Sequence, residues 1–382
     1  MKVLIGMPSA DSWGGPASSE PPFVAALHRH GVDVREEIYV YGDKEKPTAF
    51  FERVRRVLQT ALRFRRILND ENFDLIHLNT AFDLKTLLRD SASIFLMNPK
   101  KAKIFLKLHG SETDVLTSRN PLTVVLRNYI KTSVHGFGVH TAEEKSNFIR
   151  AGFASEKFYF VKNAVTIAEN LPENFSRPPK EKPEIFRLLF VSRFIAAKGL
   201  LETVRGCAIV RERGFRFVLT CVGDGEMRRA AESQAESLGL QREVKFTGYI
   251  PEAEVTNYFF DSDIFIFPTR HAEGFPNVLF KAVAVGMPVV TTRIRAAADY
   301  LKESENCLFC TQKPEDIAGK IIELIENKSL RDAMSANNLK FGKTLLPENI
   351  AAEFTEIYMD ILEQNPKSQI PNPKSKCAEL PV

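Results

Sequence analysis

Two cationic residues lie five positions apart in the second half of the chain. Arg193 follows an apolar run at residues 185–191, and Lys198 precedes Gly199, where the pattern predicts that a helix opens. Two cations beside one strand-to-helix turn can bind a pair of phosphates. Surface salt bridges are the alternative use of these side chains.

A second stretch whose residues could bind a ligand or take part in catalysis is residues 268–290, P-T-R-H-A-E-G-F-P-N-V-L-F-K-A-V-A-V-G-M-P-V-V. We expect an apolar strand at 263–267, a loop containing Glu273, and a helix that has Pro276 near its first turn and ends at Gly286. Free backbone N–H groups at such a helix start attract an anion such as a diphosphate, and an ordinary β–α–β crossover is the other interpretation. The residues expected to offer these groups are Asn277, Val278 and Leu279.

A histidine ends one predicted strand in the first half. The strand covers residues 103–108, and His109-Gly110 follows it. Because ligands of doubly wound sheets gather at the carboxyl ends of strands, His109 is a candidate to face a cleft, and a packed structural histidine is the alternative. Gly14 and Gly15 lie in the loop after the first strand, without the G-x-G-x-x-G spacing of a dinucleotide site.

The five cysteines are scattered and odd in number, which is typical of a reducing compartment. Cys307 and Cys310 have C-x-x-C spacing, but no second pair or histidine cluster accompanies them, and their segment has the pattern of a buried strand. We therefore predict neither a metal nor a redox site here.

The length of 382 residues predicts two domains, and strands alternating with helices in both halves predict two doubly wound parallel sheets of the α/β class. The first domain is expected at 1–168, a linker rich in proline and charge at 169–184, the second domain at 185–345, and a disordered tail at 365–382. A net charge of +4 gives no general case for nucleic acid. Without a credible secretory signal or a run of 18 apolar residues, a cytoplasmic protein is expected, soluble or peripheral on a membrane.

A basic amphipathic helix is predicted at residues 50–68. Its apolar face is expected to comprise Phe50, Val54, Val57, Ala61, Phe64 and Leu68. Six arginines between Arg53 and Arg66 accompany one acid, Glu52, and Lys100, Lys101 and Lys103 extend the patch. Such a helix is either a solvated face or a surface that rests on anionic lipid.

The order of several short motifs resembles one family. They are G-G after the first strand, H-G at residue 109, S-R-F-I-A-A-K-G from residue 192, V-G-D-G, F-T-G-Y-I-P and E-G-F-P-N-V-L. Together they resemble the retaining glycosyltransferases of family four, over nearly the whole chain to about Tyr358. The resemblance implies a GT-B fold, in which two Rossmann-like domains face each other across a cleft and a last helix, here about 347–364, returns to the first domain.

The resemblance also implies roles for individual residues. Arg193 and Lys198 would bind the diphosphate of a UDP- or GDP-sugar donor, Glu273 would contact hydroxyls of the donor sugar, and His109 would lie near the anomeric carbon. No metal, cofactor or protein nucleophile is implied. The remaining donor-binding candidates are Gly15, Gly248, Gly274, Phe275, Pro276, Asn277, Val278, Leu279 and Lys281.

Two positions depart from the family pattern. The second glutamate of the E-x7-E motif should stand eight residues after Glu273, where this chain has Lys281. The family's carboxylate accepts hydrogen bonds from the ribose hydroxyls, whereas an ammonium only donates. Lys281 is expected to meet a phosphate, pair with a nearby acid or point to solvent. Residues 295–298, R-A-A-A, stand where the family often has a glycine–glycine turn followed by proline and glutamate.

The expected function is transfer of a hexose, with retention of configuration, from a nucleotide sugar to a saccharide or lipid-linked acceptor, in envelope or surface-polysaccharide biosynthesis. A nucleotide-sugar 2-epimerase on the same fold is one alternative, and it needs acid and base residues at the sugar's C2. A glycosyltransferase-like binding subunit without turnover is another, and Lys281 is the feature that favours it.

Overall fold

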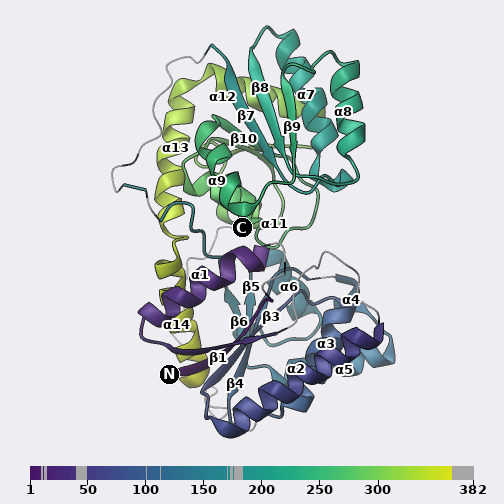
Figure 1. Cartoon of the computed structure of the whole chain (residues 1–382), viewed down its shortest axis with the longest axis vertical. Helices are drawn as coiled ribbons and strands as arrows, with labels where there is room; N and C mark the ends of the chain where they lie inside the picture. The colour runs from purple at the N-terminus through teal and green to yellow at the C-terminus, as the bar shows by residue number, and fades with distance from the viewer. Residues whose placement is uncertain are drawn as a thin grey trace.

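The computed structural model describes residues 1–9, 12, 15–39, 50–99, 101–111, 113–169, 171–172, 175 and 184–363. Within these residues the chain forms two six-stranded parallel sheets, one in each half, with helices packed on them (Figure 1). The predicted α/β class with two doubly wound sheets is confirmed. Most of the predicted linker at 169–184, and all of the predicted tail at 365–382, lie outside the described residues.

The first sheet has the strand order β2-β1-β3-β4-β5-β6. Its strands are β1 (Lys2–Met7), β2 (Asp33–Ile38), β3 (Leu75–Thr80), β4 (Lys103–Leu108), β5 (Gly136–Val139) and β6 (Phe158–Phe160). The helices of this half are α1 (Gly15–Arg29), α2 (Phe50–Asp70), α3 (Leu84–Met97), α4 (Thr113–Thr117), α5 (Pro121–Ser133), α6 (Ala142–Arg150) and the short η1 (Ser155–Lys157).

The second sheet has the order β12-β11-β10-β7-β8-β9. Its strands are β7 (Phe186–Val191), β8 (Phe217–Val222), β9 (Val244–Gly248), β10 (Ile264–Phe267), β11 (Val289–Thr292) and β12 (Leu308–Cys310). Its helices are η2 (Ala196–Lys198), α7 (Leu200–Glu212), α8 (Arg228–Ser237), α9 (Glu252–Asp261), α10 (Asn277–Ala284), α11 (Arg295–Tyr300), α12 (Pro314–Glu326) and α13 (Lys328–Lys343), and α14 (Pro347–Glu363) follows them.

The chain changes direction across the second sheet between its neighbouring strands β7 and β10. In doubly wound sheets, ligands bind at the carboxyl ends of the strands that flank such a switch point. Strand β7 ends at Val191 and β10 ends at Phe267, so the segments that carry Arg193 and Glu273 leave the sheet at this place.

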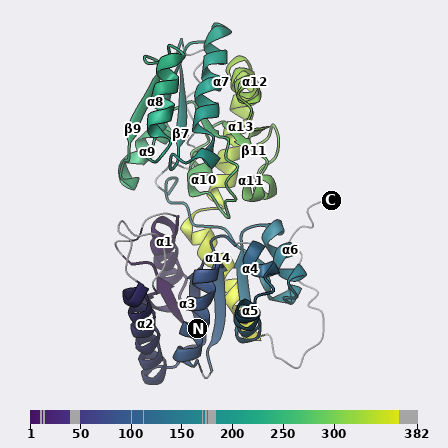
Figure 2. The same ribbon diagram turned by 90° about the vertical axis from the view of Figure 1, so that its right-hand side faces the viewer.

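The last helix, α14, packs on the first half of the molecule. In Figures 1 and 2 it continues from α13 into the lobe of the first sheet, where it contacts α1. Ile350, Phe354 and Tyr358 are fully buried there in a cluster shared with Val3 and residues of α1. The hydroxyl group of Tyr358 lies 2.5 Å from Nδ1 of His77 in β3, so α14 joins the core of the first domain by both apolar and polar contacts.

Two local expectations were wrong. Gly15, expected in the loop after the first strand, is the first residue of helix α1, and this helix contains Pro21 and Pro22. Interior prolines lack the N–H that a helix uses, but burial of Ser19, Glu20, Phe23 and other residues of α1 outweighs this preference. In α2, Ala61 and Phe64 are buried as predicted, whereas Val54 is exposed.

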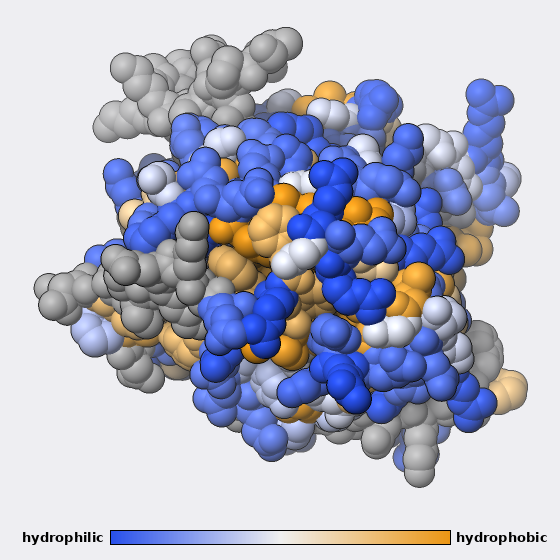
Figure 3. Space-filling model, turned by 90° about the horizontal axis from the view of Figure 1, so that it is seen from above, coloured by the Kyte–Doolittle hydropathy of each residue, from blue (hydrophilic) through white to orange (hydrophobic). Residues whose placement is uncertain are grey.

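The two ends of the molecule differ in surface character. The outer end of the second half is mostly hydrophilic, with an apolar area near its centre (Figure 3). The first half exposes large apolar side chains on α2, α3 and α5, among them Phe51, Phe95 and Val125. Among the described helices, none combines the length and the apolar character needed to cross a membrane.

Candidate functional site

The loops that follow β7 and β10 are joined to each other at the switch point. The N–H of Arg270 donates to the carbonyl oxygen of Ala197 over 2.7 Å. Gly199 has a φ of +78°, and an added Cβ would lie 2.6 Å from the carbonyl oxygen of Pro268. Only glycine fits this close approach, which fixes Lys198 against the loop of Glu273.

Lys198 and Glu273 form an ion pair at this point. The Lys198 side chain is only 6% exposed, and its ammonium lies 5.3 Å from the centre of the Phe267 ring. Burial, together with the nearby positive charge of Arg193, lowers the pKa of Lys198 to about 7. The predicted cations Arg193 and Lys198 are therefore close together beside Glu273, and both guanidinium and ammonium can bind an anion there.

Helix α10 begins beside the first residues of α1. The side-chain amide of Asn277 donates to the carbonyl oxygen of Gly15 (3.0 Å) and to the hydroxyl of Ser18 (3.2 Å). Its oxygen accepts from the amide of Asn163 over 3.0 Å. The N-termini of two helices, with their partial positive charges, thus lie together, and the loop of Glu273, which pairs with Lys198, leads into one of them.

One detail of the predicted helix start was wrong. The N–H of Leu279 donates to the carbonyl oxygen of Pro276 over 3.0 Å, so it is not a free donor for a ligand. The Leu279 side chain is fully buried in the core, and the Phe275 ring stacks on Phe280 with 3.8 Å between centroids. At this turn the side chains of Asn277 and Val278 are only partly buried and are therefore the ones that can contact a ligand.

The histidine loop of the first half meets the glutamate loop of the second. A Cβ added to Gly274 would lie 3.3 Å from the backbone carbon of His109 and 3.3 Å from the nitrogen of Gly110. The same Cβ would lie 3.2 Å from the ring of His140. Any side chain at position 274 would push the two loops apart, so Gly274 allows His109 and Glu273 to lie across one narrow gap.

Lys281 pairs with an acid, which decides among its three expected roles. Its ammonium forms an ion pair with Glu252 at the start of α9, and burial lowers the pKa of Lys281 to about 8. Gly248 lies at the end of β9, with β8 between β9 and β7, and a Cβ there would be 3.0 Å from the Arg228 guanidinium. Gly248 is therefore separated by β8 from the strand that precedes Arg193, and Lys281 is paired with Glu252 of α9.

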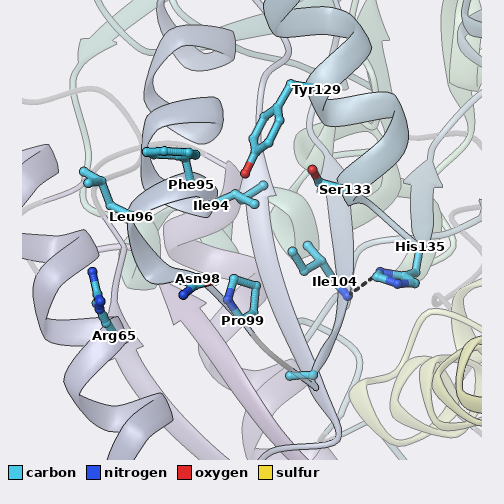
Figure 4. Close-up of a pocket in the computed structure, with 11 residues that line it drawn as sticks. Arg65, Ile94, Phe95, Leu96, Asn98, Pro99, Ile104, Tyr129, Ser133 and His135 are labelled. Carbon is cyan, nitrogen blue, oxygen red and sulfur yellow. Dashed lines mark hydrogen bonds between the residues drawn. The ribbon is translucent and has the colours of Figure 1, made fainter.

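A cavity of about 490 Å³ lies in the first half, away from this site (Figure 4). Arg65 of α2, Phe95 of α3 and Tyr129 of α5 line it, together with Ile104 near the start of β4. His109 follows the opposite end of β4, so the cavity is separated from the candidate site by the length of that strand.

Sequence reasoning missed two polar residues of the site. His140 follows β5 as His109 follows β4, and its ring lies 5.5 Å from that of Phe275. Asn163 follows β6 and bonds to Asn277. Their position after parallel strands was the available signal, since these strand ends lie on one edge of the sheet. Among the described residues, no group of three or more histidine, cysteine or acidic side chains is placed to hold a metal ion.

The second half of the chain is similar to known glycosyltransferases. Residues 172–341, less than half of the chain, match the family model described as glycosyl transferases group 1. The amylovoran biosynthesis glycosyltransferase AmsK of Erwinia amylovora is 26% identical, over 56% of this chain and 49% of that protein. An uncharacterised glycosyltransferase of Methanocaldococcus jannaschii is 24% identical, over 78% of each. The alignment thus spans about half the length of the first of these relatives.

Solved structures share the fold over nearly the whole chain. Anabaena HepE in complex with UDP-glucose is 18% identical, has a TM-score of 0.70, and aligns with 94% of this chain and 100% of that one. WaaG, a glycosyltransferase involved in lipopolysaccharide biosynthesis, has a TM-score of 0.64 at 15% identity and aligns with 96% of this chain and 100% of that one. At such identities the likeness shows the fold, which is a two-domain, Rossmann-like GT-B fold.

Proposed function

We propose that this protein is a retaining hexosyltransferase that uses a nucleotide-diphosphate sugar and acts on a saccharide or lipid-linked acceptor in surface-polysaccharide biosynthesis. The observation that carries the proposal is the pair of cations Lys198 and Arg193 at the switch point, beside the loop of Glu273 that leads into the N-terminus of α10. A diphosphate has the charge and size that this arrangement complements. The match of residues 172–341 to glycosyl transferases group 1 supports a transferase.

The reaction breaks the bond between the anomeric carbon and the leaving phosphate oxygen, and it forms a bond from that carbon to the acceptor oxygen on the same face. Negative charge develops on the departing diphosphate, and Lys198 and Arg193 stabilise it. The acceptor hydroxyl gives its proton to the leaving phosphate, so no protein nucleophile is needed. Because two fixed cations act on the leaving group, we expect transfer to continue in EDTA.

Glu273 has a second role in this proposal. In the absence of a ligand it pairs with Lys198. When a diphosphate takes its place beside the ammonium, the carboxylate becomes available to accept hydrogen bonds from hydroxyls of the donor sugar. UDP- and GDP-sugars are both candidates as donor, and the HepE complexes with UDP and UDP-glucose favour the uridine nucleotide.

The basic helix α2 suggests that the protein acts at the inner face of a membrane. In its first turns the apolar residues Phe51, Leu58 and Leu62 are exposed beside arginines such as Arg55. Apolar side chains that enter the headgroup region and arginines that meet anionic lipid are the two parts of an interfacial helix. Replacement of the α2 arginines by glutamine is expected to reduce co-sedimentation with anionic vesicles, and unchanged binding would remove this part of the proposal.

A catalytically silent binding subunit is the second candidate, favoured by Lys281 and its ion pair with Glu252. The two candidates differ in turnover. An enzyme hydrolyses or transfers from its donor, and Glu273→Gln abolishes this activity while the fold persists. The similar proteins are glycosyltransferases and do not favour the 2-epimerase. Epimerase activity would be detected as formation of the 2-epimer when the protein is incubated with UDP-N-acetylglucosamine.

The test is a thermal-shift panel with UDP, GDP, ADP and their sugars. A ligand at about 100 times its Kd stabilises the folded state by about 2.7 kcal/mol, so one nucleotide class is expected to raise Tm. Lys198→Met is expected to weaken the apparent affinity for the nucleotide at least tenfold, since it removes a charge-assisted contact, and the rise in Tm should be smaller. The matched control is Lys328→Met, which removes a lysine paired with Asp332 on the outer helix α13. No shift with any nucleotide at millimolar concentration would overturn the proposal.

A further inference from the structure

A buried ion pair lies beneath His109 in the first half. Nζ of Lys107 in β4 lies 2.6 Å from Oε1 of Glu20 in α1, and both side chains are fully buried. Asn79, at the paired position of the neighbouring strand β3, is also fully buried. Buried charges persist only when they are paired and hydrogen-bonded, so this group has a fixed arrangement.

The hydrogen bonds of Asn79 fix the orientation of its amide. Nδ2 donates to the carbonyl oxygen of Gly6 over 3.1 Å, and it lies 3.5 Å from the second carboxylate oxygen of Glu20. Both partners are acceptors, so nitrogen and not oxygen must face them. Oδ1 of Asn79 is then the atom that lies 2.7 Å from Nε2 of His109.

An acceptor oxygen at this distance requires a proton on Nε2. In a neutral imidazole only one nitrogen carries hydrogen, so Nδ1 of His109 is the acceptor nitrogen. Nδ1 is bonded to Cγ and is therefore nearer the backbone of His109, which meets Gly274 across the gap between the halves.

The charges around His109 keep the ring neutral. Glu20 lies 3.7 Å from Nε2, but Lys107 compensates its charge. The pKa of His109 lies well below its ordinary value. Burial is the largest cause, the positive charge of Lys107 is the second, and His140 and His77 have smaller effects. On the side of the second half, Glu273 precedes Gly274 in the same loop, and its charge is paired with that of Lys198.

We infer that Asn79, Glu20 and Lys107 are positioning residues that hold His109 as the neutral Nε2–H tautomer, with Nδ1 as the acceptor nitrogen of the ring. The place of His109 beside a nucleotide-sugar donor rests on the proposed function, whereas the tautomer does not. In this state His109 neither donates a proton from Nδ1 nor adds positive charge beside the leaving group.

The direct test is nitrogen NMR of the full chain labelled with ¹⁵N-histidine. The chain has seven histidines, and loss of one ring pattern in His109→Gln assigns the signal. We expect the Nε2–H pattern, unchanged as the pH varies from about 5.5 to 8, on both sides of the ordinary histidine pKa. An Nδ1–H pattern, or titration near the ordinary pKa, would overturn the inference even in a protein without activity.

The positioning role is tested with Asn79→Asp, which has the same shape and adds a negative charge. The carboxylate should raise the pKa of His109, so that the ring titrates and kcat/KM falls about tenfold per pH unit on the acid side, where the wild type is level. Asn337→Asp, exposed on α13, is the matched control and should leave both NMR signal and pH profile unchanged. An Asn79→Asp protein that folds and keeps the wild-type His109 signal at all pH values would refute the positioning role. If Asn79→Asp does not fold, the wild-type tautomer alone decides.

Discussion

Binding of a nucleoside diphosphate is expected to take up a proton at Lys198. Burial and the charge of Arg193 lower the pKa of this lysine to about 7, even though Glu273 lies beside it. At about pH 8 roughly nine-tenths of the free protein therefore has a neutral Lys198. A diphosphate in contact with the amine favours the charged form and raises its pKa, so binding is coupled to protonation.

The magnitude follows from the pKa. Below about pH 7 Lys198 is already charged, so its titration should not change the affinity for UDP as the pH falls further. Above that pH the affinity should fall by up to tenfold per unit, equivalent to about 1.4 kcal/mol, until the pKa of the complex is reached. At about pH 8, close to 0.9 proton per nucleotide should be taken up, and the phosphate contributes little because its own pKa is about 6.

Calorimetric titration in two buffers of different ionisation enthalpy measures this uptake directly. The matched variant is Lys198→Arg, because arginine stays charged at every pH used and should bind UDP without proton uptake. Lys328→Met, on the outer helix α13, should behave as the wild type. If the wild type takes up no proton at about pH 8, or if Lys198→Arg takes up as many, the linkage argument is wrong.

Four further outcomes are expected. Lys281→Glu places a carboxylate beside Glu252; repulsion at this exposed acid should cost at most about 1 kcal/mol in urea unfolding, and Glu252→Lys in the same chain should restore it. The same Lys281→Glu change should increase the preference for UDP over 2′-deoxy-UDP about fivefold in competition binding, since it supplies an acceptor for ribose hydroxyls. Gly274→Val should lower kcat/KM at least tenfold with little change in Tm, because its side chain enters the gap between the two halves. Lys107→Met should lower the free energy of unfolding by about 3–5 kcal/mol by leaving Glu20 buried without its partner, and Lys107→Met with Glu20→Gln should lose less.

The architecture of this protein could be predicted from local sequence patterns. Alternating apolar strands and amphipathic helices predicted two parallel sheets, because a strand buried on both faces has a pattern that differs from that of a helix. The sequence also predicted that the segment with Arg193 and Lys198 lies at the same sheet edge as the loop of Glu273. Both segments follow predicted strands, and the carboxyl ends of parallel strands share one edge.

Local patterns could not predict which of these residues come into contact, because those contacts form only in the assembled fold. Glu20, Asn79 and Lys107 come from three separate elements, and nothing in their local sequence marks them as one group beneath His109. The pairing of Lys281 with Glu252 likewise depends on how α9 and α10 pack on the same sheet. Helix and strand patterns arise from short-range periodicity, whereas these contacts depend on side chains that are distant in the chain and become neighbours only when the sheets are assembled.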